Sequence, residues 1–207
     1  MQIELNKVCK DIKGKRILDN ISLTLNSGNI YGFTGDNGCG KTVLFKTILG
    51  LMKKSSGNIF VDGALLTDLL QNVGFVIERP EYIPYYSAFK NLEILASYHK
   101  SVGESEIKNT LITVGLDPED KKKVGMYSLG MKQKLALAMA FFENPDVLIL
   151  DEPLNALDRH SVVSIRQKIL DEKNNGKLIL IASHYKEDIE ALCDVILCME
   201  DGKIIGG

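Results

Sequence analysis

The residues best suited to chemistry lie in a glycine-rich stretch, residues 35–42, with the sequence GDNGCGKT. It fits the pattern G-x-x-x-x-G-K-[S/T], a loop whose backbone N–H groups surround phosphate oxygens. Its three glycines lack a Cβ, so the backbone can adopt the positive φ angles that turn those N–H groups inward. Lys41 can bridge the β- and γ-phosphates of a nucleotide, and the hydroxyl of Thr42 can ligate Mg²⁺.

The neighbouring segments place this loop between a strand and a helix. Residues 28–34 have the apolar character of a short buried strand, and residues 41–51 have that of a helix. The N-terminus of such a helix directs its positive dipole end at a bound anion. A chance glycine-rich turn closing a hairpin is the alternative, but it does not explain a match of this length in this context. We expect the chain to bind a nucleoside triphosphate.

Two carboxylates follow a second apolar segment, residues 147–150. Asp151, at the end of a buried strand, is placed to hold Mg²⁺, usually through water. Glu152 would then lie beside the γ-phosphate, where it can polarise the attacking water as a general base. The alternative is a pair of acids that cap a turn before Pro153, and the phosphate loop makes it the weaker interpretation.

Residues 127–133, with the sequence YSLGMKQ, lead into a predicted helix. Ser128 can serve as its N-cap, and Gly130 adds freedom at the turn. The same hydroxyl and N–H groups at a helix start would also suit a second anion site. From these residues alone, both interpretations stay open.

The composition of the 207-residue chain is ordinary for a globular protein, with 45% hydrophobic and 25% charged residues. The net charge of −2 gives no electrostatic reason to expect nucleic acid as a partner. No apolar run approaches the roughly 18 residues of a membrane span, and the N-terminus lacks the apolar core of a signal peptide. We therefore expect a cytoplasmic protein whose membrane role, if it has one, needs a partner. The four cysteines show no metal-type spacing.

Apolar strands alternate with helical patterns along most of the chain, which predicts an α/β fold with a parallel sheet. The expected strands are at residues 3–5, 17–25, 28–34, 58–63 (with a tight turn), 73–77, 147–150, 178–182 and 195–199. The expected helices are at residues 41–51, 89–98, 104–114, 132–142 and 161–173. We expect one domain over residues 1–207, with a helical subdomain at 79–145 inserted between two parts of a core, 1–78 and 146–207.

Together these stretches give nearly the whole chain a resemblance to the ATP-binding subunit of an ABC transporter. The matching segments are, in chain order, the phosphate loop at 35–42, the signature motif at 128–133, the Walker B pair Asp151 and Glu152, the D-loop at 155–158, and the switch histidine His184 after Ser183. The order of these motifs makes the resemblance specific. Residues 76–78 and 127–131 are especially similar to subunits of bacitracin- and lantibiotic-type exporters.

The resemblance implies a P-loop NTPase (RecA-like) core, an N-terminal antiparallel β subdomain and the inserted α-helical subdomain. It also implies an Mg²⁺-dependent ATPase in which two subunits, identical or different, face head to tail with two ATP molecules between them. Each ATP would lie on one subunit's phosphate loop and under the signature motif of the other subunit. Catalysis would use Lys41, Glu152 and His184, with His184 contacting the γ-phosphate.

The same resemblance assigns binding roles by position. The residues implied to bind the nucleotide are Gly35, Asp36, Asn37, Gly38, Cys39, Gly40, Lys41, Thr42, Val43, Ser128, Gly130 and Asp158. The residues implied to hold Mg²⁺ are Thr42, Asp151 and Glu78.

Three features depart from the family's pattern. Glu78 stands where the family usually has Gln, which adds negative charge beside the phosphates. Leu129 and Met131 replace the second Gly and the Gln of the signature. Ile12 aligns with the aromatic residue that usually stacks on adenine, a loss of about 1–3 kcal/mol of stacking. We therefore expect weak discrimination between ATP and GTP.

An aromatic cluster follows shortly after residue 78, comprising Tyr82, Tyr85, Tyr86 and Phe89. In the resembling family this region receives the transmembrane permease subunit, which an exposed aromatic patch would suit. Packing within the helical subdomain is an equal alternative. We expect a subunit at the inner face of the cell membrane that powers a transporter, more specifically an exporter. A soluble non-transport ABC ATPase of the assembly or repair type is the alternative, whereas a P-loop kinase or GTPase would not explain the later motifs.

Overall fold

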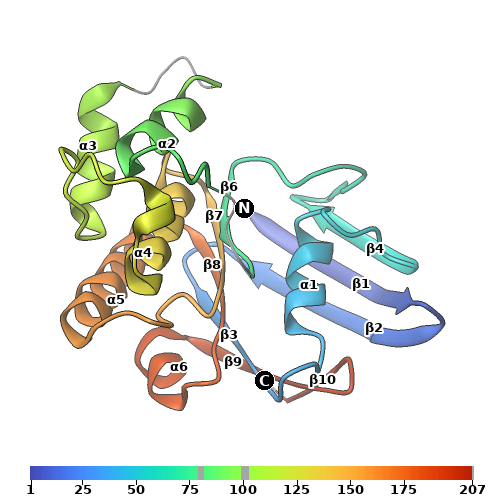
Figure 1. The fold of residues 1–207 in the computed structure, drawn as a ribbon. Helices are drawn as coiled ribbons and strands as arrows, with labels where there is room; N and C mark the ends of the chain where they lie inside the picture. The colour runs from blue at the N-terminus through green and yellow to red at the C-terminus, as the bar shows by residue number, and fades with distance from the viewer. Residues whose placement is uncertain (79–81, 99–102, 207) are drawn as a thin grey trace.

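The computed structural model describes residues 1–78, 82–98 and 103–206. They form two β-sheets and the helices that pack around them (Figure 1). The strands are β1 (Gln2–Ile12), β2 (Lys15–Asn26), β3 (Ile30–Thr34), β4 (Ser56–Val61), β5 (Ala64–Leu65), β6 (Val73–Val76), β7 (Val147–Asp151), β8 (Leu178–Ala182), β9 (Val195–Glu200) and β10 (Lys203–Gly206). The helices are α1 (Lys41–Ile48), α2 (Ala88–Ala96), α3 (Glu104–Thr113), α4 (Leu129–Phe141), α5 (Arg159–Asn174) and α6 (Lys186–Leu192), with a 3₁₀ turn at Val124–Met126.

The larger sheet has the strand order β10-β9-β3-β8-β7-β6. β3 is hydrogen-bonded in parallel to β8 on one side and to β9 on the other, and β7 lies between β8 and β6. β8 is buried throughout and β7 is buried up to its last residue, as expected for strands covered on both faces. Because these strands are parallel, β3 and β7 end at the same edge of the sheet, where parallel sheets bind ligands.

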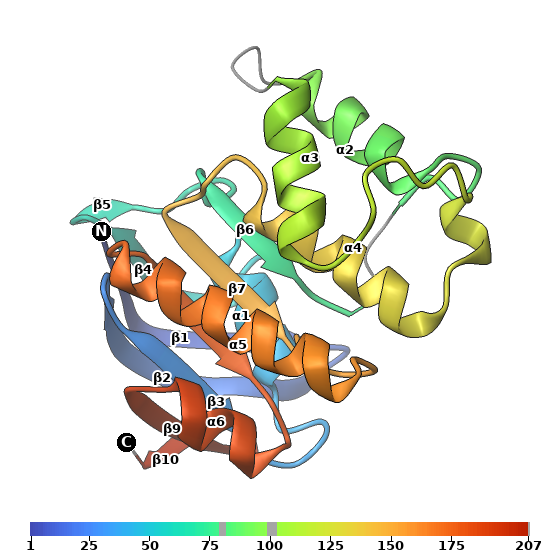
Figure 2. The same ribbon diagram turned by 90° about the vertical axis from the view of Figure 1, so that its left-hand side faces the viewer.

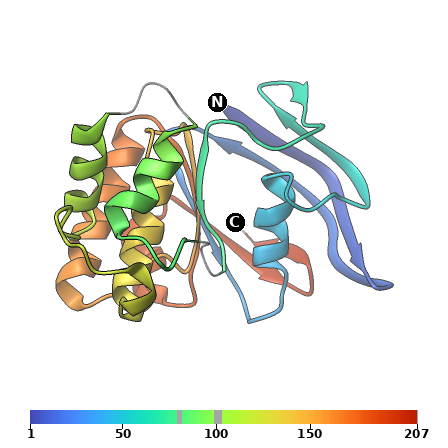
Figure 3. The same ribbon diagram turned by 45° about the horizontal axis from the view of Figure 1, so that its top comes forward.

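The smaller sheet, in the order β2-β1-β4-β5, is antiparallel. Helix α1 lies between the two sheets (Figure 3) and shares one apolar core with both. Phe45 of α1 meets Phe33 of β3 edge to face, with ring centroids 5.2 Å apart. This packing fixes the start of α1 relative to the end of β3, and so fixes the loop between them.

Helices cover the opposite face of the larger sheet (Figure 2). α5 and α6 pack there, and α2, α3 and α4 form a helical layer attached near β6. α4 approaches β6 so closely that a Cβ at Gly74 would lie 1.8 Å from the carbonyl oxygen of Ala140. None of the helices in the three described ranges is both long and apolar enough to cross a membrane.

The structure confirms the predicted α/β fold with its parallel sheet and N-terminal antiparallel sheet. The two N-terminal strands are longer than predicted, because they pair as a hairpin that also includes polar residues. Helix α1 ends at Ile48 instead of residue 51, since Gly50 adopts a φ of 78°. The short elements α6 and β10 were not predicted. α2, α3 and α4 lie within residues 79–145, but the boundary residue 79 is outside the described residues, and the division into subdomains stays a prediction.

Candidate active site

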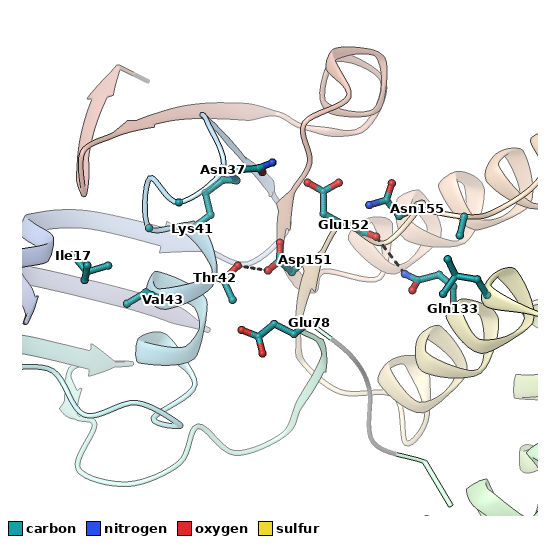
Figure 4. Close-up of a pocket in the computed structure, with 14 residues that line it drawn as sticks. Ile17, Asn37, Lys41, Thr42, Val43, Glu78, Gln133, Asp151, Glu152 and Asn155 are labelled. Carbon is teal, nitrogen blue, oxygen red and sulfur yellow. Dashed lines mark hydrogen bonds between the residues drawn. The ribbon is translucent and has the colours of Figure 1, made fainter. Parts of the chain in front are cut away.

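A pocket of about 440 Å³ opens between the start of α1 and the start of α4 (Figure 4). Its walls come from segments that lie far apart in the sequence. The lining residues are Ile17, Asn37, Gly38, Gly40, Lys41, Thr42, Val43, Glu78, Leu129, Gln133, Asp151, Glu152, Asn155 and Ala156. The fold thus brings part of the glycine-rich loop, Glu78 and both strand-end acids into one cavity.

The glycine-rich loop depends on its glycines at two positions. Gly35 has a φ of 136°, and a Cβ there would lie 2.2 Å from the carbonyl oxygen of Met199. Gly40 has a φ of 115°, and a Cβ there would lie 3.0 Å from the carbonyl oxygen of Ile17. The loop is therefore seated against β9 and β2, and helix α1 begins directly after it, with Leu44 N donating to Gly40 O over 2.8 Å.

The Lys41 side chain folds back over this loop. Its Nζ donates to Gly35 O over 2.6 Å and to Asp36 O over 3.1 Å, and the residue is buried. Both acceptors are neutral carbonyls. A phosphate oxygen in the loop would give the ammonium a charged acceptor, and charge-assisted hydrogen bonds are roughly twice as strong as neutral ones.

Thr42 and Asp151 join the helix start to the strand end. The Thr42 hydroxyl donates to Asp151 Oδ2 over 2.6 Å. Burial raises the pKa of Asp151, and the carboxylates of Glu152 and Glu78 raise it further, against the opposing effects of the Thr42 hydrogen bond and Lys41. A crowded, desolvated carboxylate of this kind gains stability from a nearby cation.

This donor set fits Mg²⁺ that arrives with a nucleotide. Thr42 and Asp151 offer oxygen atoms, which Mg²⁺ prefers, and in nucleotide sites the ion takes one or two protein ligands together with phosphates and water. Within the part of the chain that the structure describes, no three His, Cys, Asp or Glu side chains cluster to form an all-protein metal site. A partial shell of this kind is what a nucleotide-borne ion needs.

Glu152 is held from two directions at the pocket wall. Its backbone has a φ of 51°, and its N–H donates to Ala182 O at the end of β8 over 2.8 Å. Its Oε1 accepts a hydrogen bond from the backbone N–H of His184 over 3.1 Å and lies 2.9 Å from His184 Nδ1. The predicted base and the predicted switch histidine are therefore in direct contact, although His184 itself does not line the pocket.

Gly35, Asp36 and Cys39 belong to the glycine-rich loop but do not line the pocket, and three further predicted binding residues lie outside both the loop and the pocket. Ser128 is the N-cap of α4, and its Oγ accepts from Met131 N over 3.2 Å, while Gly130 lies in the first turn of that helix. Asp158 is the N-cap of α5, where hydrogen bonds from the hydroxyl and N–H of Ser161 lower its pKa to about 2. One chain therefore does not bring these residues to its own phosphate loop.

Two details differ from the simplest expectation. Glu78 lines the pocket with a φ of 55°, but its Oε1 also forms an ion pair with Lys46 Nζ at 2.7 Å. Ile12 is not among the lining residues, and Ile17 with Val43 forms the apolar wall instead. Ile17 is partly buried and precedes the buried Leu18 on β2, and strand alternation places these two side chains on opposite faces.

Sequence reasoning also missed the lining role of four residues, Leu129, Gln133, Asn155 and Ala156. All four belong to segments that had been singled out, at 127–133 and 155–158. Their types alone gave no signal that they face the pocket.

Comparisons with known proteins agree with this geometry. A family model described as ABC transporter matches residues 18–155. The chain is 42% identical to the uncharacterized ABC transporter ATP-binding protein YybJ of Bacillus subtilis, over 98% of this chain and 94% of that protein. It is 38% identical to the lantibiotic transport ATP-binding protein SrtF of Streptococcus pyogenes, over 93% of this chain and 84% of that protein. It is 36% identical to the bacitracin transport ATP-binding protein BcrA of Enterococcus faecalis, over 98% of this chain and 68% of that protein.

Solved structures share the fold. An ATP-binding subunit of an ABC transporter gives a TM-score of 0.89 at 24% identity, over 99% of this chain and 88% of that chain. A dimeric ATP-binding cassette bound to ADP and Pi gives a TM-score of 0.88 at 23% identity, over 98% of this chain and 96% of that chain. The resemblance drawn from the sequence motifs is confirmed, including its similarity to bacitracin and lantibiotic subunits. The chain belongs to the ABC transporter family, as an ATP-binding ATPase subunit.

Proposed function

We propose that this ATPase subunit dimerises head to tail on ATP, hydrolyses it with Glu152 as the general base, and powers an exporter through a membrane permease. One observation carries the proposal. The Glu152 carboxylate lies on the same pocket wall as Asp151, facing the glycine-rich loop across the cavity (Figure 4). The assignment of each residue's role rests on this arrangement.

In this proposal the loop binds the triphosphate. Backbone N–H groups of residues 35–42 surround the phosphates, and Lys41 exchanges its carbonyl acceptors for phosphate oxygens. Thr42 and Asp151, with Glu78 nearby, hold Mg²⁺. When bound, the ion neutralises charge on the β- and γ-phosphates.

Hydrolysis then falls to Glu152 and His184. Glu152 accepts a proton from the attacking water, and such general base catalysis contributes about 10²–10⁴-fold to a rate. His184, in contact with the same carboxylate, keeps it oriented and contacts the γ-phosphate. Asn155 lines the same pocket and offers a neutral amide there.

The exposed start of α4 supports a second subunit. Ser128 is exposed there and Gly130 is partly exposed, both outside the pocket of their own chain. In a twofold dimer each chain offers the same surfaces to its partner, so the helix start of one subunit can cover the nucleotide of the other. Asp158, the N-cap of α5, lies next to the start of α4, with its Oδ2 3.8 Å from Lys134 Nζ. The partner is a second copy or a related ATP-binding subunit.

The names of two relatives support a role in transport together with a permease. SrtF and BcrA are named for lantibiotic and bacitracin transport, respectively. Exposed apolar side chains lie between β6 and α2, namely Ile83 (39% exposed), Tyr85 (76%) and Tyr86 (43%). Tyr82 and Phe89 instead pack against the core. We assign the exposed group to the permease, and accordingly propose that the subunit lies at the cytoplasmic face of the membrane.

The Glu152→Gln variant tests the hydrolytic role. It preserves the size of the side chain but removes the base, so kcat for ATP should fall at least about 100-fold while ATP affinity stays within about twofold. ATP should also trap a dimer, measured by size-exclusion chromatography with light scattering. Glu187→Gln, an exposed acid in the first turn of α6, is the matched control and should keep wild-type turnover. Retained turnover in Glu152→Gln would remove Glu152 from its role.

Affinity purification from detergent-solubilised native membranes tests the transport role. A polytopic membrane protein in stoichiometric amount supports the permease, and its identity narrows the substrate. Recovery with soluble partners alone would favour a non-transport ABC ATPase.

A further inference from the structure

The first turns of α4 hold the segment that follows β7 at three points. Gln133 reaches the backbone at residues 152–153, Gly130 lies against the carbonyl of Ala156, and Lys134 Nζ lies 3.8 Å from Asp158 Oδ2. The segment so held begins with Glu152. It is separated from α4 in the sequence, so this contact is a tertiary feature of the fold.

Gln133 makes the most specific of these contacts. Its Nε2 donates to Pro153 O over 2.9 Å. It also donates to Glu152 O over 3.3 Å (Figure 4). The residue is partly buried on the pocket wall, so water replaces these bonds poorly. The Glu152 carbonyl also accepts a hydrogen bond from the backbone N–H of Asn155 over 3.3 Å, whereas the shorter contact of Gln133 is to the carbonyl of Pro153.

The backbone that Gln133 holds is strained. Glu152 has a φ of 51° and Ala156 has a φ of 63°, in the left-handed region that non-glycine residues rarely adopt. Such conformations persist where surrounding contacts determine them. The N–H of Glu152 is fixed by Ala182 and its carboxylate by His184. On the carbonyl of Glu152, the Gln133 amide acts together with the N–H of Asn155, and Gln133 is the donor that comes from another element.

We infer that Gln133 is a positioning residue, whose amide fixes the backbone of Glu152 and ties the catalytic carboxylate to the start of α4. The inference rests on the proposed role of Glu152 as the base. It adds a connection between two sites, because the same helix start presents Ser128 and Gly130 to the partner's nucleotide. A displacement of α4 when the partner's nucleotide binds therefore reaches the base of the chain's own site through one side-chain amide.

The inference predicts a split between catalysis and binding. Gln133→Met keeps the length of the side chain but removes the donor, and Gln133→Glu places an acceptor against two carbonyls. We expect kcat of the purified full-length chain with ATP and Mg²⁺ to fall about tenfold in Gln133→Met and at least as much in Gln133→Glu. The Kd for ATP should stay within twofold, because the glycine-rich loop is untouched, and Tm should stay within a few degrees of wild type.

Gln167→Met is the matched control. Gln167 is exposed on α5, where its Nε2 donates to Asp171 Oδ1 over 2.9 Å, and its loss should leave kcat and Kd unchanged. The double variant Gln133→Met/Glu152→Gln should still form the ATP-dependent dimer, which shows that Gln133 acts on hydrolysis and not on assembly.

Two results would overturn the inference. One is wild-type kcat in Gln133→Met, and the other is a rise in the Kd for ATP that accounts for the loss of rate. Either result, together with a hydrolysis-dead Glu152→Gln variant, leaves the proposed function intact and removes only the role of Gln133. A fully active Glu152→Gln variant would instead remove the proposed function itself.

Discussion

Gly130→Ala tests how tightly the start of α4 packs against the segment after β7. A Cβ at Gly130 would lie 2.7 Å from the carbonyl oxygen of Ala156. That distance is about 0.6 Å short of the roughly 3.3 Å at which a carbon and a carbonyl oxygen meet without repulsion. The oxygen belongs to backbone with a φ of 63°, so it cannot rotate away as a side chain would.

Two effects of opposite sign determine the magnitude. Ala is a better helix former than Gly by about 1 kcal/mol, which favours the variant. Overpacking a close contact costs about 1–3 kcal/mol, which disfavours it. Because the contact is with backbone, we expect the clash to dominate, with a net loss of about 1 kcal/mol in the free energy of unfolding.

Thermal and urea unfolding of the purified chain, without nucleotide, measures this loss. For a chain of this length, 1 kcal/mol corresponds to a fall of roughly 2–4 °C in Tm. Leu129→Ala is the control in the same helical turn. Leu129 is 73% exposed, so its unfolding free energy should change by no more than about 0.5 kcal/mol. A Gly130→Ala variant more stable than wild type would refute the close packing of α4 on residues 152–156.

Three further predictions concern buried charges and the pocket wall formed by Ile17 and Val43. Burial raises the pKa of Asp151, so the stability gained from protonating this carboxyl is present in acid and is lost as pH rises through that pKa. Asp151→Asn should therefore raise Tm at pH 7 without nucleotide. Equal Tm values for the variant and the wild type at pH 7 would contradict the burial argument. Lys177 is 6% exposed and pairs with Glu172, which is 3% exposed and also pairs with Lys168. Because Lys168 still compensates Glu172, Lys177→Met should lower the free energy of urea unfolding by about 1–3 kcal/mol, and Lys177→Met/Glu172→Met should recover most of it. Ile17→Tyr adds an aromatic ring to the pocket wall. Stacking of about 1–3 kcal/mol per base should lower the Kd for ATP at least about fivefold, measured by fluorescence titration. An unchanged Kd would mean that adenine binds elsewhere.

The local features of the site could be predicted from the sequence. The glycine-rich loop is written in consecutive residues, and its geometry follows from three glycines and a helix start. Asp151 and Glu152 follow a short, continuous apolar run, which is typical of a strand covered on both faces. These features need only neighbours in the chain, so a single sequence was sufficient for them.

The features that depend on distant partners could not be predicted. The contact of Gln133 with the carbonyl of Glu152 and the ion pair of Lys46 with Glu78 join residues 19 and 32 positions apart. The choice of Ile17 over Ile12 for the wall depends on the β1–β2 hairpin, whose register shifts at several points. Each shift reverses which side chains face the pocket, and no alternation in the sequence records it.

The central place of β3 has a consequence for how the protein is made. Ile30 pairs with Ile179 of β8, and Thr34 pairs with Cys198 of β9. A ribosome adding about 5–20 residues per second needs roughly 7–30 s to proceed from Ile30 to Ile179. During that time both edges of the apolar strand β3 are unpaired. The glycine-rich loop that follows β3 cannot take its final shape until β8 and β9 have emerged from the ribosome. ATP binding therefore has to follow the synthesis of β8 and β9, and a chaperone that covers β3 in the interval would protect its unpaired edges.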